Sequence, residues 1–528
     1  MKKLVHALFF LCLVLINYSM VFGQFINPQW SKQFGGSLNE AAGFGNGSFG
    51  SPSVSVAAGE NLDVHYVLSY TSSSDGYVNT NAGSEDVWLL KLNLEGDTLW
   101  TKVLGGTEAE RGFHVLYEAG AVYVCGRTNS NNGDFTGNNG GSDGFITKLD
   151  TDGNVLWTRL YGGTQPESFY QMIYHNGGLI VVGEAGSSDG DLSSINVGLG
   201  QAWILKVNPE NGAILWQTVT AGVQQPNNAN FIENFWSIAA VPDNSGYIAV
   251  GVDGDFNDFN TDKLLINKYD LNGNKIWEKS YGSNARDWAA QVVCIQEKIY
   301  IAANAGGSGG DVSNFLGTTD LWMLELAANG DLLNEKTFGG SDLDYPYGLF
   351  VRNNQELVVT GITRSTDFDL SNSTPAGAID AWLLVVSTDF QIQQSIRWGG
   401  SEGDFAHQMA RSSDGYVVVG RTDSNDGVFN NSNGGRDLFY TKFTEMVNTV
   451  EFIQSPVQIF PNPTNDVLNI SVLENGFIKV LDVTGKIIHS EEIKTGNSAL
   501  NVNQFPAGIY YLQFNTPFNQ TTLKWVKQ

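Results

Sequence analysis

The chain has 528 residues, more than one ordinary domain holds, so at least two domains are expected unless a repeat extends one of them. Its 61 glycines and 13 tryptophans, with only 16% charged residues, indicate turn-rich β structure and argue against long amphipathic helices. The 42% of apolar residues is enough for a packed core, which argues against global disorder. The net charge is −26, and residues 24–456 alone carry −28, because residues 1–23 contribute +2 and residues 457–528 sum to zero. So negative a surface excludes nucleic acid as an expected partner.

The first 23 residues have the pattern of a secretory signal peptide. Lys2 and Lys3 precede an almost continuous apolar run, residues 4–16, and a suitable cleavage site follows, so the mature chain is expected to start at Gln24. The alternative is a membrane anchor, although this run is short for a membrane span. No later stretch approaches 18 apolar residues, so we expect a mature chain without a transmembrane segment.

A repeat of 57 to 60 residues fills residues 24–446. Residues 143–163 read DGFITKLDTDGNVLWTRLYGG, and residues 86–106 match them almost position by position. Each period holds four short apolar runs separated by Asn, Asp and Gly, the residues that tight hairpins require. Four antiparallel strands in about 58 residues indicate one blade of a β-propeller.

The two ends of the repeat region distinguish a closed propeller from the alternative, a linear β-solenoid. The last copy begins at Asp437 and stops before its fourth strand, and the missing strand stands near the N-terminus, in residues 28–36. Complementary halves close a ring and remove two sheet edges at once, whereas an open solenoid has no use for them. The sequence therefore predicts an all-β, seven-bladed β-propeller with four-stranded blades, the last blade closed by the N-terminal strand.

The repeat ends before residues 457–528, which follow a predicted linker at residues 447–456. Short alternating strands separated by Pro, Asn and Gly predict a small β-sandwich for this C-terminal module. Its distinctive motifs are Phe460-Pro461-Asn462-Pro463, Asp482 with Gly485-Lys486, Phe505-Pro506-Ala507-Gly508-Ile509-Tyr510, and Lys524-Trp525-Val526-Lys527.

On these motifs the module closely resembles the type A C-terminal sorting domain of the type IX secretion system of Bacteroidota. The resemblance implies that the secretion machinery is a partner, that the chain crosses the outer membrane, and that it is then released or anchored to surface lipopolysaccharide. We therefore expect a protein that is secreted or attached to the outer cell surface. The residues to which the resemblance assigns the sorting signal are Pro461, Asn462, Pro463, Gly485, Gly508, Tyr510, Lys524 and Lys527. The propeller repeats resemble a family of uncharacterised repeats of secreted bacterial proteins, which implies no activity.

Most units carry an Asp/Asn-Gly-Asp core in the loop between their second and third strands. Calcium takes carboxylate and carbonyl oxygens from flexible, glycine-containing loops, and this composition could supply them. The complete calcium-loop pattern is absent, and the alternative is that the loops are Asx turns that start the third strand. The residues proposed as calcium ligands are Asp189, Asp191, Asp253, Asp255, Asp367 and Asp369.

A second set of carboxylates follows the glycine pair that ends each unit. If the next strand is the innermost one, these groups form an acidic ring at one mouth of the channel, with pKa values raised by mutual repulsion. The alternative is structural: each carboxylate accepts backbone N–H bonds at the turn between two blades. The set is Glu40, Glu110, Glu167, Glu233, Asp287, Asp344 and Asp404.

No catalytic motif stands out in the chain. The zinc-protease, nucleophile-elbow, Walker and dinucleotide patterns are absent from suitable contexts. We therefore expect a binding protein, an adhesin or a module that contacts an extracellular glycan or protein, with no catalytic residues and no cofactor beyond the calcium considered above. The alternative is an extracellular enzyme that degrades polysaccharide or peptide, because a propeller can assemble a site from distant loops.

Overall fold

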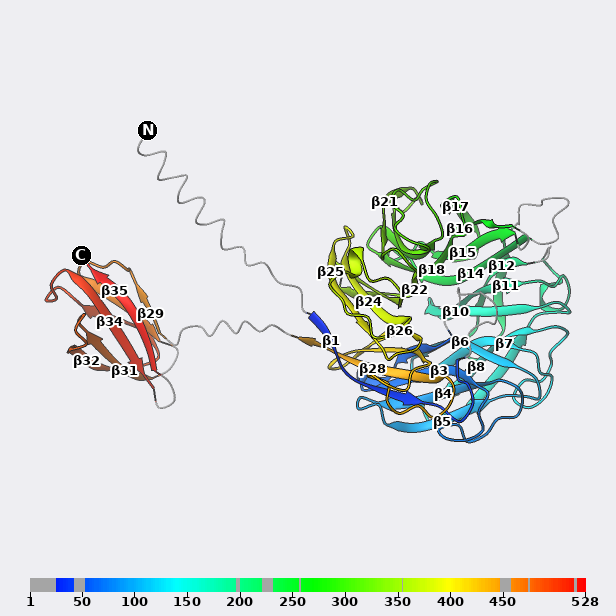
Figure 1. Ribbon diagram of the computed structural model, residues 1–528, viewed down its shortest axis with the longest axis horizontal. Coiled ribbons are helices and arrows are strands. Elements are labelled where there is room, and N and C mark those ends of the chain that lie inside the picture. The colour runs from blue at the N-terminus through cyan, green and yellow to red at the C-terminus, as the bar shows by residue number, and fades with distance from the viewer. Residues whose placement is uncertain are drawn as a thin grey trace. The chain divides into compact units, whose positions relative to one another are not determined.

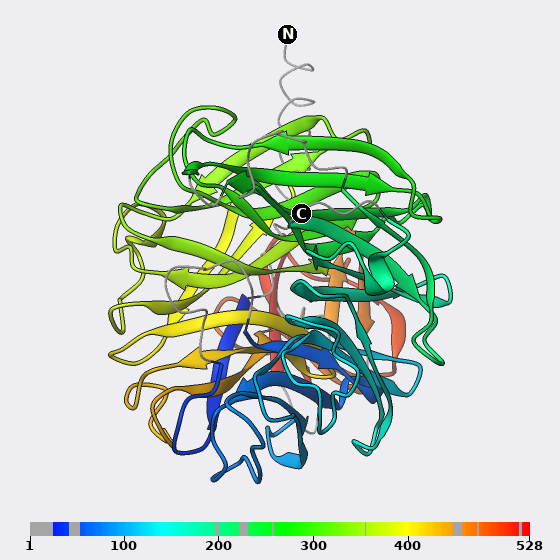
Figure 2. The same ribbon diagram turned by 90° about the vertical axis from the view of Figure 1, so that its right-hand side faces the viewer.

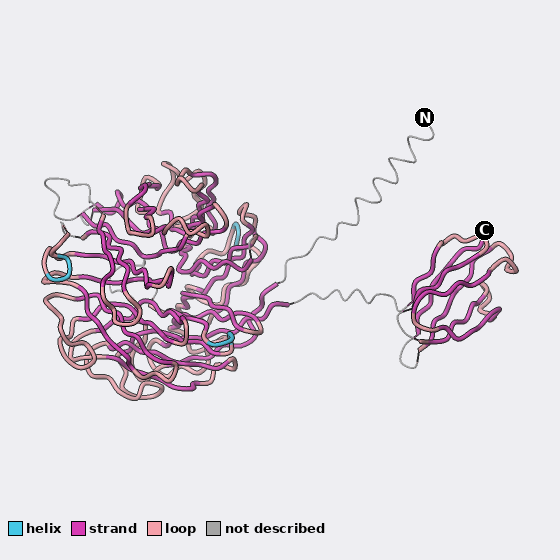
Figure 3. The backbone as a smooth tube through the Cα atoms, turned by 180° about the vertical axis from the view of Figure 1, so that it is seen from behind, coloured by secondary structure: helices cyan, strands magenta, loops and turns pink. Residues whose placement is uncertain are grey.

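The computed structural model describes residues 25–41, 53–195, 200–220, 231–255, 258–353, 355–446, 457–472, 475–516 and 520–528 (Figure 1). They form two compact units, Phe25–Glu445 and a C-terminal unit within Met446–Gln528. The predicted signal peptide and linker lie outside the described residues. Regular structure is almost entirely β-strand, and no helix of the described residues is long and apolar enough to cross a membrane (Figure 3). The short 3-10 helices are Glu60–Leu62, Gly190–Leu192 and Phe368–Leu370.

Within Phe25–Glu445, and counting described residues, the strands form seven four-stranded antiparallel sheets. Six sheets take four consecutive strands each, so their connections are simple hairpins. The first three contain β2 (Ser55–Ala58), β3 (Val64–Thr71), β4 (Asp86–Asn93) and β5 (Thr98–Leu104); β6 (Glu110–Glu118), β7 (Ala121–Thr128), β8 (Asp143–Asp150) and β9 (Val155–Tyr161); and β10 (Glu167–His175), β11 (Gly178–Ala185), β12 (Gln201–Val207) and β13 (Ile214–Val219). The next three contain β14 (Phe231–Ala240), β15 (Tyr247–Asp255), β16 (Asp258–Tyr269) and β17 (Lys275–Tyr281); β18 (Trp288–Ile295), β19 (Lys298–Ala305), β20 (Asp320–Leu326) and β21 (Leu332–Phe338); and β22 (Asp344–Asn353), β23 (Glu356–Thr363), β24 (Asp380–Ser387) and β25 (Ile392–Trp398).

The seventh sheet joins the two ends of the unit. Its order is β1 (Phe25–Phe34), β28 (Asp437–Met446), β27 (Gly415–Thr422) and β26 (Asp404–Ser412). In Figure 1 the blue β1 accordingly lies beside the orange β28, and Figure 2 shows the same ends of the unit from the side. The N-terminal strand therefore completes the last copy of the repeat, as the split repeat predicts.

Burial differs sharply between the strands of one sheet. In β8, a third strand, seven of the eight residues are buried, because neighbouring sheets cover both of its faces. The fourth strand of the same sheet, β9, is largely exposed or half-buried. Such edge strands are open to pairing with other chains, and charged side chains oppose this. Cations stand at one equivalent position of five of the fourth strands: Lys32, Lys102, Arg159, Lys279 and Lys336.

The first strands of neighbouring sheets bond directly to one another, which places them on the inner side of the unit. Gln171 accepts the backbone N–H of Ile238 in the next sheet at 2.7 Å. The same kind of bond connects the seventh sheet to the first, where the Ser55 hydroxyl donates to the Gln408 amide oxygen at 2.8 Å. Equivalent bonds run from Val115 N to Ser55 Oγ, from Val292 N to Ser237 Oγ and from Leu349 N to Gln291 Oε1.

The C-terminal unit contains two sheets that share one core. One sheet has the order β29-β30-β33 and the other β32-β31-β34-β35. Leu468, Val480 and Trp525 are fully buried between them, as expected of a β-sandwich. The strands are β29 (Val457–Phe460), β30 (Val467–Val472), β31 (Gly476–Leu481), β32 (Ile487–Ile493), β33 (Gly496–Asn501), β34 (Gly508–Asn515) and β35 (Gln520–Lys527).

Candidate functional site

The seven carboxylates that follow the glycine pairs are all buried at the turns between sheets, with at most 3% of the residue exposed. Glu167 shows their geometry, because it accepts the backbone N–H groups of Gly163, Gly186 and Ser187 at 3.0, 3.1 and 2.7 Å. Equivalent turn bonds go to Glu110 from Gly106, to Asp287 from Ser283, to Asp344 from Gly340 and to Asp404 from Gly400. Burial raises the pKa of both Glu40 and Asp404 to about 7. This geometry favours the structural role over an acidic ring open to solvent.

The residues proposed as calcium ligands already accept hydrogen bonds within the protein. Asp189 accepts the backbone N–H of Thr164 at 2.8 Å, and Asp191 accepts that of Gly162 at 3.3 Å. Asp367 and Asp369 make the same two bonds, to Ser341 at 2.8 Å and to Gly339 at 3.2 Å. These loops therefore fasten the glycine turn of the preceding sheet.

Asp253 stands apart from those four residues, because it lies on β15 opposite Glu233. The side chain of Asp255 lies outside the described part of the chain. Among the described residues, no group of three or more His, Cys, Asp or Glu side chains is arranged to hold a metal ion. The structure thus brings Asp189 close to Asp191, and Asp367 close to Asp369, without gathering the six aspartates.

The same loops insert an apolar side chain into the core. Leu192 and Leu370 end two of the loop motifs and are at most 1% exposed. The second motif position has a left-handed backbone, with φ of +59° at Gly190, where a Cβ would stand 2.1 Å from the Gly162 carbonyl oxygen. In the sixth sheet Phe368 occupies this position with φ of +48°. These are the features of an Asx-type turn that positions the third strand.

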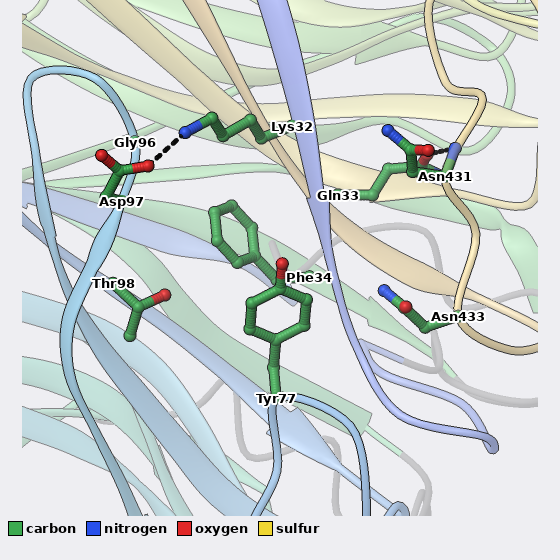
Figure 4. Close-up of a pocket in the computed structure, with 9 residues that line it drawn as sticks. All are labelled: Lys32, Gln33, Phe34, Tyr77, Gly96, Asp97, Thr98, Asn431 and Asn433. Carbon is green, nitrogen blue, oxygen red and sulfur yellow. Dashed lines mark hydrogen bonds and ion pairs between the residues drawn. The ribbon is translucent and has the colours of Figure 1, made fainter.

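A pocket of about 290 Å³ opens where the seventh sheet meets the first (Figure 4). We call it the seam pocket. Phe34 and Tyr77 meet edge to face in it, with ring centroids 5.2 Å apart, and the Tyr77 residue is 42% exposed. Across from them Lys32 and Asp97 form an ion pair of 2.6 Å. The lining residues are Lys32, Gln33, Phe34, Tyr77, Gly96, Asp97, Thr98, Asn431 and Asn433.

The equivalent place between the second and third sheets is held by polar bonds. There the Tyr161 hydroxyl donates to the Gly212 carbonyl oxygen at 2.6 Å, and Asp191 accepts the Gly162 N–H. At the seam, the junction of the seventh and first sheets, Phe34 stands at the position of Tyr161 and has no hydroxyl, and Tyr77 stands at the position of Asp191. Both substitutions remove a bond that ties two sheets together, and both leave an aromatic ring facing the pocket.

The seam pocket was not among the sites expected from the sequence. The sequence nevertheless contains a pattern that could have indicated this pocket. The loop between the second and third strands reads Asp75-Gly76-Tyr77-Val78 in the first sheet, whereas it reads Asp189-Gly190-Asp191-Leu192 in the third sheet. Recognising it requires knowing that residues 28–36 and residues 86–106 lie in adjacent sheets. A departure from the repeat at the place where its two ends meet is therefore the informative pattern.

The sorting motifs converge at one edge of the C-terminal unit. The Asn462 side chain donates to the Lys524 carbonyl oxygen and accepts the Val526 N–H, each at 3.0 Å. Gly508 pairs with Lys527 in the β34–β35 ladder. Tyr510 is buried against Trp525, with stacked rings 4.9 Å apart. The first and last motifs are thus neighbours, whereas Gly485 lies apart, in the turn after β31 at φ of +85°.

Residues 458–528 match the family described as the secretion system C-terminal sorting domain. The C-terminal unit is a sorting domain. Its presence indicates a protein that is sorted by the type IX secretion system, for export or attachment at the cell surface. The chain in front of the sorting domain has a β-propeller-like fold.

Other known proteins resemble the chain more distantly. The regulatory protein FlaEY of Caulobacter vibrioides is 27% identical over 149 residues, which are 25% of this chain and only 15% of that protein. The WD40 domain of Neurospora crassa Pan2 has a TM-score of 0.34 and 11% identity over 62% of this chain and 86% of its own. BamB from Moraxella catarrhalis has a TM-score of 0.34 and 12% identity over 79% of this chain and 100% of its own. Likenesses at this level say nothing about function.

Proposed function

We propose that the exported protein is a closed seven-bladed β-propeller that binds a saccharide outside the cell through the seam pocket. Closure is supported by the place of β1 in the last sheet and by the Ser55–Gln408 bond between the last and first sheets. Deletion of residues 25–34 should then leave β28 as an open edge and cause association through it. A deletion variant that stays monomeric in size-exclusion chromatography, with unchanged stability, would argue against the closed ring.

The binding role rests on one observation, the composition of the seam pocket. Asn431, Asn433 and Thr98 carry groups that both donate and accept hydrogen bonds, which suits sugar hydroxyls. The exposed ring of Tyr77 offers an apolar face with a polar tip, which suits the C–H face of a pyranose. A few polar groups beside an aromatic wall, in about 300 Å³, are typical of a small-ligand site.

The pocket favours a neutral saccharide over a charged one. The Lys32–Asp97 ion pair supplies one charge of each sign and leaves the pocket without a net charge. The chain around it carries a formal net charge of −26, which repels acidic polysaccharides at long range. The ligand class proposed for this pocket is therefore a neutral hexose or pentose unit of an extracellular glycan.

A glycan array with the purified full chain, with and without calcium, tests this function. Tyr77→Ala removes the exposed ring and should weaken neutral-glycan binding at least 10-fold, a loss of about 1.4 kcal/mol. Val428→Ala is the matched control, since Val428 is the equivalent loop residue of the seventh sheet and is 47% exposed. Binding that Tyr77→Ala leaves unchanged would overturn the pocket assignment, and turnover of a bound glycan would establish an enzyme instead.

A further inference from the structure

The outer face of the sheet β32-β31-β34-β35 in the C-terminal unit changes character along its length. In β34 every second side chain faces the shared core and is buried, and the others face outward. The solvated face of an antiparallel sheet is normally polar, as Gln513 and Asn515 are at one end of this strand. At the other end the outward residues are Ile509 and Tyr511, which are 40% and 38% exposed.

The neighbouring strands place further apolar side chains at the same end of this face. Tyr511 pairs with Leu481 of β31, and Leu481 pairs in turn with Ile487 of β32. Ile509 pairs with Val526 of β35. Residues paired across two strands point to the same face of the sheet, so these side chains are neighbours. We call them the outer apolar patch, which consists of Leu481, Ile487, Ile509, Tyr511 and Val526.

The outer apolar patch takes no part in holding the C-terminal unit together. The core between the two sheets contains side chains such as Ile478, Leu512 and Trp525, and none of the five patch residues belongs to it. Ile487 is 49% exposed, although it lies on an edge strand. Contiguous apolar side chains on a folded surface mark interaction sites more often than isolated ones do. The patch is therefore a candidate docking surface.

Lysines border the patch. Lys524 pairs directly with Tyr511, Lys486 precedes Ile487 in the chain, and both lysines are exposed. The carboxylate that follows Leu481, Asp482, accepts the backbone N–H groups of its own turn at 2.8 and 3.1 Å. The matching surface of a partner is therefore apolar at its centre and carries carboxylates around it.

We propose that the outer apolar patch is the surface by which the sorting domain docks on a receptor protein of the secretion machinery. Residues 458–528 match a sorting domain, and sorting requires that a protein recognise it. Residues 24–456 carry a net charge of −28, whereas residues 457–528 sum to zero. A receptor with an acidic rim is repelled by the former and accepts the latter, so it selects the sorting domain. This surface is independent of the seam pocket, which lies in the other unit.

Export of the full chain tests this docking surface, in a bacterium whose type IX secretion system exports the unaltered chain. Tyr511→Ser should lower the exported fraction about 10-fold, because interfaces concentrate their affinity in central aromatic side chains. Phe477→Ser is the matched control and should leave export normal. Phe477 is 42% exposed on the same outer face, but it pairs with Glu492 and Asn515 at the polar end. Normal export of Tyr511→Ser, or an equal loss in Phe477→Ser, would overturn the proposal.

Charge variants test the lysine rim without altering a buried side chain. Lys524→Glu and Lys486→Glu should each reduce export several-fold, because they place like charges against an acidic receptor. Lys494→Glu is their control and should have no effect, since Lys494 is exposed and follows the far end of β32. If Tyr511→Ser proves unstable, these variants decide, and unchanged export of both would contradict the receptor.

The purified full-length variants distinguish the receptor from other occupants of the patch. A lower melting temperature of Tyr511→Ser with normal export would mean that the patch packs against the chain itself. Loss of a dimer in size-exclusion chromatography with normal export would mean that a second copy covers it. Either result contradicts the proposal, whereas reduced export of a monomer with an unchanged melting temperature supports it.

Discussion

The junction between the second and third sheets and the junction between the seventh and first use the same turn with different side chains. In the former, Glu167 accepts three backbone N–H bonds and Tyr161 reaches the next hairpin. At the seam, Glu40 accepts a bond from Thr71, but its Oε2 has no hydrogen-bond partner, and Phe34 has no hydroxyl. The hydrogen bonds that hold the repeated turn therefore differ between these two junctions. The seam pocket opens at the junction that lacks the tyrosine hydroxyl bond.

The largest expected effect comes from removing the Glu167 carboxylate, which accepts three backbone N–H bonds. Glu167→Ala leaves the N–H groups of Gly163, Gly186 and Ser187 buried without their acceptor, and each such loss costs about 1–3 kcal/mol. We expect the free energy of unfolding to fall by about 3–5 kcal/mol in urea titrations. Glu40→Ala is the matched variant at the seam and should cost clearly less. Equal losses would mean that the two junctions do not differ in strength.

A smaller effect should come from introducing backbone strain in one loop and relieving it in the equivalent loop of another sheet. Gly190→Ala forces a Cβ into a left-handed position and against the Gly162 carbonyl oxygen, so it should destabilise by about 1–3 kcal/mol. Phe368→Gly relieves the same conformation and should stabilise by about 1 kcal/mol, because the Phe368 residue is 58% exposed and loses little packing. Thermal melting of both variants checks the pair. Opposite signs are required, and two losses would show that Phe368 contributes contacts of its own.

His114 offers a way to strengthen one inner junction. It occupies the place that Gln171, Gln291 and Gln408 take in other sheets, and its buried Nδ1 has no hydrogen-bond partner. By register, a glutamine there reaches the N–H of Met172 in the next sheet, which should add about 1 kcal/mol. Denaturant titration of His114→Gln measures this gain, and a loss would mean that the imidazole packs better than the bond it lacks.

The smallest expected effect is a dependence of stability on pH. Burial raises the pKa values of Glu40, Asp320 and Asp404 to about 7, so the folded chain holds protons that the unfolded chain releases. The stability that these three carboxyl groups contribute is therefore fully present below their unfolded pKa values, and this contribution is lost as the pH rises through about 7. Buried His65 and His114, with pKa values near 4, act in the opposite sense, but only below about pH 6.5.

Calorimetric melting between pH 6.5 and 8 isolates the carboxyl groups from those histidines. The melting temperature should fall slightly over this range at constant ionic strength. Glu40→Gln should reduce the slope, because an amide does not titrate. A melting temperature that rises with pH would show that these carboxyl groups are ionised in the folded protein.

Much of the fold was predictable because the repeat is explicit in the sequence. The period, the four strands per unit and the pairing of residues 28–36 with the strand that begins at Asp437 all follow from local patterns, and the sheet order confirms the pairing. The sorting domain was recognisable from its motifs, and the family match to residues 458–528 confirms it. The roles of the acidic sets were left open, since composition cannot distinguish a carboxylate that binds a cation from one that binds a turn.

The sequence by itself determined the repeated architecture and the sorting domain, because strand periodicity, turn residues and short motifs are local properties. Tertiary structure alone decided what the departures from the repeat mean. Tyr77 and Phe34 are 43 positions apart in sequence and form one wall of a pocket only because β1 lies in the last sheet. Sites of this kind depend on which strands and loops the order of the sheets brings together, and that is a long-range property of the chain.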